Sequence, residues 1–443
     1  MRNWAKLPGV QSSSQLVPAI SVLPKDGAGR MRKVAGVNFL LLQGDAVSRA
    51  RQHGRYLKNE IWDGVPMVLE KKNEWIIRRG LNFLHPRSIF MEIPLWIYRN
   101  ILISLFDRGH EPRYRWINRA LSEETGIPIS VFRESIFHAD ALMLLARTSV
   151  MKHLVREWPS IGLPGCTSAA VLGGWTQSGR LLAARNMDYP LIGPWEKHST
   201  VFFHEPSEPG EIPHLGVSSA GVHTAGLTGM NLEGITLATH AHFARKVVLG
   251  GSPVMEIGDE VVRRARTIGQ AVDIARKTKR IGHWTFVVTS AAENSAVAIE
   301  MSPDTTHVRE PDDGVLVHTN IFHSKALQND EALISGGCCA DLVGRLRRVR
   351  TLLDSRRGEI NAEDLGRVLG DQVDPETGES RALGGTVSVV TTVKSVVFDA
   401  GQQRIYLSSA KESPTALGDF LEIPWGEFRS PRSGFWSEEV SPE

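Results

Sequence analysis

The pattern of hydrophobic and polar positions divides the chain into a helical first part and a strand-rich second part. From about Val34 to Glu157, apolar residues recur mainly three and four positions apart, which is typical of amphipathic helices. The clearest example contains Val131, Ile136 and Leu142. This part of the chain is therefore expected to be mostly helical.

From residue 166 onward, short apolar runs separated by turn residues indicate strands. The first two flank the turn sequence Thr-Gln-Ser-Gly and predict a β-hairpin. Antiparallel strands with helices on the sheet faces predict an α+β layered fold. Strands are expected at 166–174, 180–190, 199–206, 213–222, 234–243, 283–291, 295–303 and 314–322, helices at 255–278, 337–356 and 361–372, and a last hairpin at 386–410.

These patterns suggest three regions along the 443 residues, a length sufficient for one large core or several domains. Residues 1–33 are interrupted by prolines and contain no apolar stretch typical of a signal peptide, so a flexible N-terminal tail is expected. Residues 34–165 form the mostly helical segment. Residues 166–443 are expected to carry the β-rich core, with a C-terminal tail from about residue 430.

Charge and cysteine content add to this division. Residues 1–165 contain 24 basic and 14 acidic residues, a net charge of +10, whereas the remainder carries −8. Opposite net charges favour association of the two segments. The chain has three cysteines, Cys166, Cys338 and Cys339, which argues against a disulfide framework and favours a reducing, cytoplasmic location.

The most membrane-like stretch runs from Ser88 to Phe106. It contains Glu92, Pro94 and Arg99 and is too interrupted for a transmembrane helix. Two interpretations are open: a buried helix, or an amphipathic surface that contacts lipid or a fatty acyl chain, with weak membrane association. The basic, aromatic sequence that follows is short and has acidic neighbours, so nucleic-acid binding is not expected.

The most informative position is Cys166, which follows a Pro-Gly turn and precedes a strand. The absence of a side chain at Gly165 allows close approach to the 165–166 peptide bond. Attack by the thiol on the Gly165 carbonyl, followed by hydrolysis, would make Cys166 an N-terminal residue. Its α-amine, with a pKa near 8, would then serve as the base. Alternatively, Cys166 is a small buried hydrophobic residue, or an internal nucleophile with His240 as base.

Three further side chains are candidates for the same site. Arg185 and Asp188 end the strand that follows the hairpin turn, and both are expected to face the nucleophile. Arg185 would stabilise the thiolate or the substrate carbonyl, and Asp188 would orient the new ammonium group. Asn320 ends another predicted strand and would donate to an oxyanion. A surface ion pair and a turn asparagine are the structural alternatives.

Several motifs together resemble a known family. The sequences "GCTSAAV", "GRLLAARNMDY", "GMNLEGITLATH" and "VHTNIF", with "SRARQHGRYL" earlier in the chain, are similar to cysteine N-terminal-nucleophile hydrolases. The resemblance is to the acyl-coenzyme A:6-aminopenicillanic-acid acyltransferase family, with its carcinine-hydrolase-like relatives, and more distantly to choloylglycine hydrolases and penicillin V acylases. It covers roughly residues 34–410. It implies a four-layer αββα sandwich of antiparallel sheets.

The resemblance also implies self-cleavage between Gly165 and Cys166 and assigns roles. Cys166 is the nucleophile, flanked by Arg185 and Asp188. Asn320 and the backbone N–H near His240 are the oxyanion donors. The remaining member of the set is a helical arginine, which is Arg345 or, with a shifted register, Arg347 or Arg348.

The expected activity is transfer of an acyl group from an N-acyl amide or an acyl thioester such as acyl-CoA, through a thioester on Cys166. Water as acceptor gives an amidohydrolase and an amine gives an acyltransferase. The cleaved helical fragment is expected to remain as a partner. No cofactor or metal is expected, because adjacent Cys338 and Cys339 lack zinc-ligand spacing. The alternative is a non-catalytic acyl-lipid or membrane-surface binding protein of the same fold.

Overall fold

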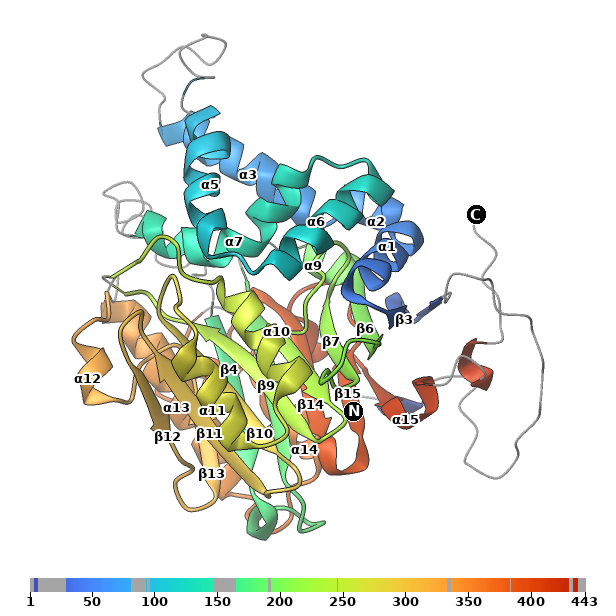
Figure 1. Cartoon of the computed structure of the whole chain (residues 1–443). Helices are drawn as coiled ribbons and strands as arrows, with labels where there is room; N and C mark the ends of the chain where they lie inside the picture. The colour runs from blue at the N-terminus through green and yellow to red at the C-terminus, as the bar shows by residue number, and fades with distance from the viewer. Residues whose placement is uncertain are drawn as a thin grey trace.

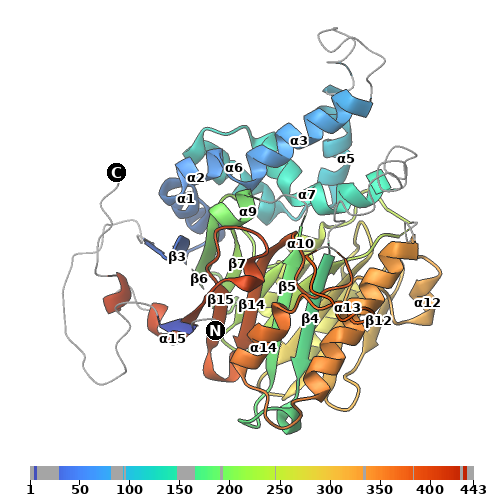
Figure 2. The same cartoon turned by 180° about the vertical axis from the view of Figure 1, so that it is seen from behind.

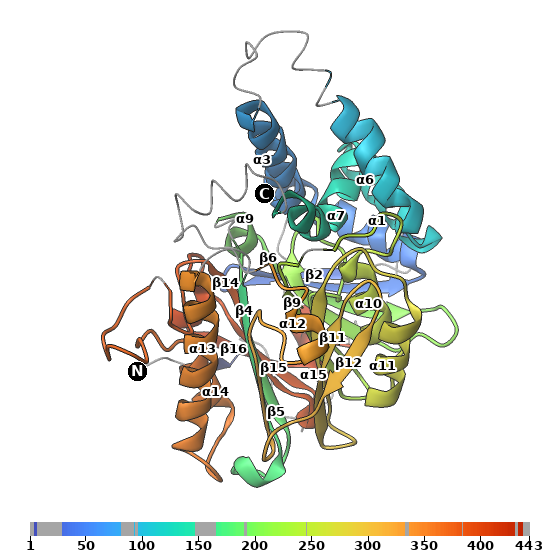
Figure 3. The same cartoon turned by 90° about the vertical axis from the view of Figure 1, so that its left-hand side faces the viewer.

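The computed structural model describes residues 4–6, 29–80, 93, 96–146, 165–189, 193–244, 246–332, 336–382, 384–429 and 433–436. Two β-sheets face each other, and helices cover their outer faces (Figure 1). The view from the side shows the layers in sequence, with further helices across one end of the sheets (Figure 3). The predicted four-layer αββα sandwich is therefore confirmed.

One sheet contains seven of the described strands and carries the candidate nucleophile. Its neighbouring strands are antiparallel except for the pair β1 and β16. Across the sheet the order is β1 (Trp4–Lys6), β16 (Phe420–Pro424), β15 (Arg404–Ser408), β14 (Thr392–Asp399), β5 (Leu182–Asp188), β4 (Gly165–Val171) and β13 (Val315–His318). The predicted hairpins 166–190 and 386–410 are β4–β5 and β14–β15.

The facing sheet contains nine described strands, antiparallel except for the pair β3 and β6. Its order is β12 (Thr306–Arg309), β11 (Ser295–Met301), β10 (Trp284–Ser290), β9 (Ile235–Ala241), β8 (Thr228–Asn231), β7 (His214–Ser219), β6 (Ser199–Pro206), β3 (Val37–Gly44) and β2 (Arg30–Val34). The helical first segment thus contributes β2 and β3 to this sheet.

Helices cover both outer faces. The seven-stranded sheet is covered by α13 (Gly336–Asp354) and α14 (Ala362–Leu369), seen in Figure 2. The nine-stranded sheet is covered by α10 (Val254–Arg264) and α11 (Ile268–Lys277). The expectation of one helix over 255–278 is wrong, because the Thr267 side chain accepts the Gln270 N–H and starts a new helix.

The helices of the first segment lie across one end of the sandwich (Figure 1). They are α1 (Ala46–Tyr56), α2 (Lys58–Trp62), α3 (Val65–Gly80), the π-helix η1 (Tyr98–Leu102), α5 (Ile103–Phe106), α6 (Pro112–Thr125) and α7 (Ile129–Ala146). The first segment also contains the single-turn helix η2 (Asp107–Gly109). Single-turn helices elsewhere are η3 (Gly173–Trp175), α9 (Pro194–Lys197), α12 (Lys325–Gln328), η4 (Ala400–Gln402), η5 (Thr415–Leu417), α15 (Trp425–Phe428) and η6 (Gly434–Trp436).

The main core lies between the sheets, where inward-facing side chains of alternate strand positions meet. Phe39 and Phe203 of the nine-stranded sheet pack in the same cluster as Ala183, Val396 and Phe398 of the seven-stranded sheet, and all are nearly fully buried. This packing fixes the two sheets relative to each other, and with them the two sides of the candidate site.

Both predicted tails need correction. Within residues 1–33, Trp4–Lys6 pairs with β16 and Arg30–Val34 pairs with β3. Within the expected C-terminal tail, Phe435 and Trp436 are buried against the core, and the Arg32 guanidinium lies 4.7 Å from the centre of the Phe435 ring. Residues 1–3, 7–28, 430–432 and 437–443 lie outside the described residues.

The interpretation of Ser88–Phe106 as a buried helix is wrong for the face that the structure describes. Ile93, Trp96, Ile97 and Ile101 are 44–58% exposed, whereas Ile103 is buried. Residues 88–92 and 94–95 lie outside the described residues. Among the described helices, none is long and apolar enough to cross a membrane.

Candidate active site

Cys166 is the second residue of β4, beside β5 in the interior of the seven-stranded sheet. It lies opposite Met187, and Ser168 lies opposite Arg185. Successive side chains of a strand alternate between its faces, so these four side chains share the face toward the other sheet. Gly165, Thr167 and Asp188 belong to the opposite face, toward α13.

On the inner face, Arg185 contacts the Cys166 side chain directly. Its Nη2 donates to the Cys166 Sγ at 3.0 Å and to the Thr239 carbonyl at 3.2 Å, while Nη1 donates to the Leu227 carbonyl. Burial raises the pKa of the Cys166 thiol, and the positive charge of Arg185 opposes this shift. Arg185 is therefore placed to stabilise the thiolate, but thiolate formation still requires a base.

Asp188 does not share the face of the Cys166 side chain, contrary to expectation. Arg185 and Asp188 are three residues apart, and an odd spacing in a strand places side chains on opposite faces. The Asp188 carboxylate accepts a hydrogen bond from the Thr392 hydroxyl at 2.7 Å and lies 3.5 Å from an Arg345 nitrogen. These two partners are side chains of β14 and α13, so Asp188 lies on the helix-facing side of the sheet.

Arg345 reaches the same backbone from α13. Its Nη1 donates to the Cys166 carbonyl at 3.2 Å and to the Thr167 hydroxyl at 2.8 Å. Arg348 instead forms a 2.8 Å pair with Asp371. Of the arginines considered from the sequence, Arg345 thus lies at the site, and it holds the backbone rather than the Sγ atom.

Asn320, which follows β13, contacts the main chain at Cys166. Its Oδ1 accepts the Cys166 backbone N–H at 2.6 Å, and its Nδ2 donates to the Ala241 carbonyl at 2.8 Å. These two partners fix the orientation of the carboxamide. A carboxamide nitrogen carries two hydrogens, so a second N–H remains for an acyl oxygen at the Sγ atom.

The structure does not support the His240 backbone as an oxyanion donor. N–H groups of an antiparallel strand point alternately to its two sides. The Thr239 N–H bonds to the Leu227 carbonyl and the His242 N–H to the carbonyl of His283, which directly precedes β10. The His240 N–H therefore points toward β10, and that of Ala241 points to the other side, past Ala238, where the pairing with β8 ends.

The His240 side chain is also unsuited to act as the base. Its Nε2 lies 2.8 Å from the Ser168 hydroxyl, and the ring is fully buried. Burial, reinforced by the charge of Arg185, lowers the pKa of His240 well below its usual range. The ring is a neutral group paired with Ser168, and the group in contact with the thiol is Arg185.

Gly165 lies in a crowded position on the outer face. A methyl group there would be 3.1 Å from an Asp188 carboxylate oxygen and 3.4 Å from Arg345 Nη2. Such distances are tighter than ordinary van der Waals contacts. The lack of a side chain therefore allows Asp188 and Arg345 to approach the 165–166 peptide bond closely.

A cavity of about 40 Å³ adjoins the Cys166 side chain. Its walls are mostly apolar and come from both segments, since Ala139 belongs to α7. Beside the Sγ atom the volume admits a few water molecules. The other lining residues are Arg185, Met187, Asp188, Tyr189, Trp195, Leu227, Thr239, Ala241, Met255 and Trp284.

Asp140 of α7 holds part of this wall in place. One of its carboxylate oxygens accepts the Trp284 indole N–H at 2.9 Å, and the other accepts the Val254 N–H at 3.2 Å. The side chain is fully buried, and burial raises the pKa of Asp140 to about 7. The helical segment thus supports the cavity with a polar anchor as well as with apolar contacts.

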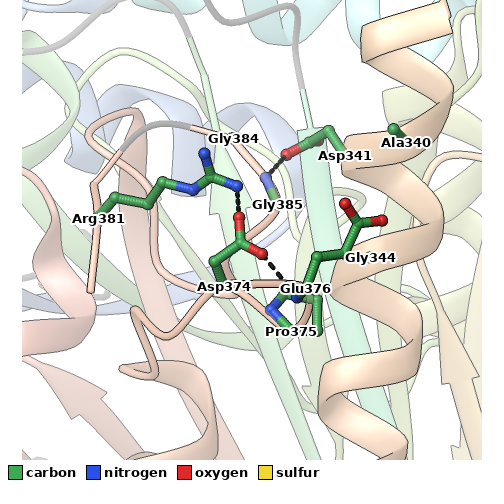
Figure 4. A pocket seen from close by; sticks show the side chains of 9 residues that line it. All are labelled: Ala340, Asp341, Gly344, Asp374, Pro375, Glu376, Arg381, Gly384 and Gly385. Carbon is green, nitrogen blue, oxygen red and sulfur yellow. Dashed lines mark hydrogen bonds and ion pairs between the residues drawn. The ribbon is translucent and has the colours of Figure 1, made fainter. Parts of the chain in front are cut away.

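A second cavity, of about 210 Å³, is lined by Asp341 and Gly344 of α13 and by residues between 374 and 385 (Figure 4). Asp341 connects the two regions, because it accepts the Arg345 Nε–H at 3.1 Å and the Gly385 N–H. Asp374 and Arg381 form an ion pair across the cavity. Among the described residues, no group of three His, Cys, Asp or Glu side chains is arranged to bind a metal ion.

Sequence reasoning missed several of these residues. Thr392, Ala241 and the aromatic cavity walls come from strands or loops distant from Cys166 in the chain. Asp140 lies within a predicted helix, but it was not among the predicted site residues. A polar residue on the apolar face of that helix was the available indication, since buried carboxylates usually have specific partners.

The family model for acyl-coenzyme A:6-aminopenicillanic acid acyl-transferase matches residues 175–414, more than half of the chain. A layered αββα sandwich with a strand-borne cysteine is the architecture implied for a cysteine N-terminal-nucleophile hydrolase. The chain belongs to the acyl-coenzyme A:6-aminopenicillanic acid acyl-transferase family. The resemblance seen in the sequence is thereby confirmed.

Two solved structures are similar to the chain at low sequence identity. A mutant conjugated bile acid hydrolase from Clostridium perfringens has 15% identity and a TM-score of 0.37, covering 60% of this chain and 94% of its own. Penicillin V acylase from Agrobacterium tumefaciens has 14% identity and a TM-score of 0.41, covering 59% and 86%. No curated protein matches the chain in sequence.

Proposed function

We propose that this protein is a self-cleaving cysteine amidohydrolase or acyltransferase. The observation that carries the proposal is the environment of Cys166: its Sγ contacts Arg185, and its backbone nitrogen contacts the Asn320 carboxamide. The nitrogen that would become a free amine and the attacking sulfur are thus each held by a separate polar side chain.

Activation would begin with attack of the Cys166 Sγ on the Gly165 carbonyl carbon. The C–N bond breaks, the Cys166 nitrogen takes the thiol proton, and Gly165 becomes bound to sulfur as a thioester. Water then hydrolyses the thioester, leaving a Gly165 carboxylate and a free Cys166 amine and thiol. The bonds from Arg345 to the Cys166 carbonyl and to Thr167 support this step by holding the backbone in place.

In turnover, the Cys166 α-amine would take the thiol proton, with Asn320 Oδ1 holding the amine. The thiolate, stabilised by Arg185, attacks the substrate carbonyl. The second N–H of Asn320 and the Ala241 backbone N–H are the proposed donors to the oxyanion. The ammonium then protonates the leaving amine. Finally the amine accepts a proton from water or an acceptor amine, which attacks the thioester and restores the thiol.

The cavity walls indicate an apolar acyl group in the substrate. Met187, Leu227, Met255 and the rings of Trp195 and Trp284 surround the space beside the Sγ atom. Linear N-acyl amides and acyl thioesters such as acyl-CoA both fit this chemistry. We favour hydrolysis, because water is always present and no acceptor site is needed.

The helical fragment would remain bound after cleavage. Strand β3 pairs with β6 along seven residues, and its central residues are fully buried. Buried Arg49 of α1 pairs with Glu211 at 3.2 Å, and Glu211 also pairs with Arg263 of α10 at 2.7 Å. We propose a cytoplasmic protein of two associated fragments, on the basis of its sparse cysteines and this interface.

The test replaces Cys166 with Ala and with Ser and follows both cleavage and activity. We expect wild-type protein to give two fragments by intact mass spectrometry, the second beginning Cys-Thr-Ser, and Cys166→Ala to remain one chain without amidase activity. Cys339→Ala is the matched control and should behave as wild type. An active wild-type protein with an unbroken 165–166 bond would contradict the proposal.

The alternative is a binding protein of the same fold without turnover. The exposed apolar residues between 93 and 101 favour it. It predicts an uncleaved chain that binds acyl lipid or vesicles and has no amidase or transferase activity against a panel of N-acyl amides and acyl thioesters. Cleavage accompanied by turnover would exclude this alternative.

A further inference from the structure

Exposed apolar side chains lie at and just before the π-helix η1 (Tyr98–Leu102), which precedes α5 and α6. Ile93, Trp96, Ile97 and Ile101 are 51%, 58%, 44% and 44% exposed. Trp96 and Ile97 directly precede the π-helix η1 and Ile101 lies within it, so these three side chains belong to one continuous described stretch, 96–106. In the same stretch Ile103 is 3% exposed. This part of the chain therefore has one side buried against the protein and an apolar side that faces solvent.

A second exposed tryptophan lies on the neighbouring helix α6. Trp116 is 58% exposed, and Arg115 and Arg119 are exposed on either side of it. The Arg115 guanidinium donates to the Asp107 carbonyl at 2.7 Å, which joins α6 to the turn that ends the first helix. These helices stand at the end of the molecule away from the sheets (Figures 1 and 3).

The charges beside these exposed apolar side chains are predominantly positive. Arg108 is exposed as well, whereas Asp107 lies 3.8 Å from Arg133 and Glu111 lies 3.6 Å from Arg263. The whole segment 1–165 carries a net charge of +10. The partner of this face therefore has an apolar part and a negative part.

We propose that the exposed residues Ile93, Trp96, Ile97 and Ile101, here called the Trp96 surface, dock together with Trp116 of α6 on a membrane that contains anionic lipids. Tryptophan favours the region between lipid head groups and acyl chains, and arginine binds anionic head groups. An amphipathic helix with this composition lies in the plane of the bilayer surface. The Trp96 surface matches both features.

Docking would also bring the candidate active site close to lipid. Helix α5 packs against α7, and α7 supplies Ala139 to the cavity beside Cys166. If the proposed function is correct, the substrates are lipophilic N-acyl amides that partition into bilayers. This last step rests on the proposed function, whereas the docking itself does not.

The test uses full-length Cys166→Ala protein, so that binding is measured without turnover. Sedimentation is compared with vesicles of phosphatidylcholine and with vesicles containing 30% phosphatidylglycerol. We expect at least about tenfold tighter binding to the anionic vesicles and weaker binding at higher salt. Trp96→Asp and Ile101→Asp should each reduce binding to the anionic vesicles at least about tenfold, and the pair Arg115→Gln and Arg119→Gln should remove the preference for them.

Leu417→Asp is the matched control, because Leu417 is 42% exposed and lies in η5, outside the Trp96 surface. It should bind like the parent protein. Equal binding by this control and Trp96→Asp, or equal binding to both vesicle types, would overturn the proposal. So would self-association through the Trp96 surface without vesicle binding, measured by light scattering. Trp96→Asp in the wild-type background should retain cleavage and activity on a water-soluble amide, which separates docking from catalysis.

Discussion

Replacing Asp140 with Asn tests whether the helical segment supports the cavity wall. Both donors to Asp140, the Trp284 indole N–H and the Val254 N–H, require an acceptor, and an asparagine offers one oxygen in place of two. At acid pH, where the parent carboxyl is protonated, the variant should be less stable than the parent by about 1–3 kcal/mol, because one buried donor loses its partner. Because Trp284 lines the cavity, the variant should also raise KM for apolar acyl substrates more than it lowers kcat.

The environment of Asp140 also predicts how the free energy of unfolding changes with pH. The pKa of Asp140 is about 7 in the fold, against a usual value of 3.8. Between these values the folded protein holds a proton that the unfolded chain has released, so stability falls as pH rises, by about 1.4 kcal/mol per pH unit. The total is about 4 kcal/mol between pH 4 and 7. An asparagine does not titrate and lacks this slope.

The assay is urea unfolding of the single-chain Cys166→Ala protein, with and without Asp140→Asn, at intervals from pH 4.5 to 8.5. The parent protein should be more stable than the Asp140→Asn variant at acid pH and less stable than that variant near pH 8. Exposed Asp304→Asn is the control and should not change the slope. A stability difference between parent and Asp140→Asn that stays constant with pH would refute the assigned environment of Asp140.

The remaining predictions concern Cys166 and its neighbours. Asn320→Ala should lower kcat by about 10²–10³ in cleaved enzyme, as measured by steady-state kinetics, because an oxyanion donor is lost. Gly165→Ala should slow the appearance of fragments on gels, since its methyl group would lie 3.1 Å from an Asp188 oxygen; activity per cleaved molecule should not change. His240→Gln should keep activity within a few-fold of wild type, and a loss as complete as in Cys166→Ala would identify the histidine as the base.

The sequence predicted the sheet hairpins well because their signals are local. Alternating apolar residues and the intervening turn are enough to place β4 beside β5, and this pairing brings Arg185 near Cys166. The same alternation places Asp188, three residues after Arg185, on the opposite face of β5 from Arg185. That error arose from judging proximity by sequence spacing without the parity that a strand imposes.

Other features depend on contacts that no local pattern reveals. The apolar run Val37–Gly44 looks like part of a helical region but pairs with β6, more than 150 residues away. Likewise, Ala241 rather than His240 presents its N–H toward the site because β8 ends its pairing at Ala238. Strand pairing across such distances decides both cases, and it is set by the tertiary core.

The pairing of β3 with β6 has a consequence for how the protein is made. If the chain is cut after Gly165, the amino-terminal product still occupies two positions in a sheet shared with the carboxyl-terminal product. Pulling the pieces apart would leave β6 as an open, apolar edge prone to aggregation. Expression of residues 166–443 alone should therefore yield insoluble protein. Co-expression with residues 1–165 should restore solubility.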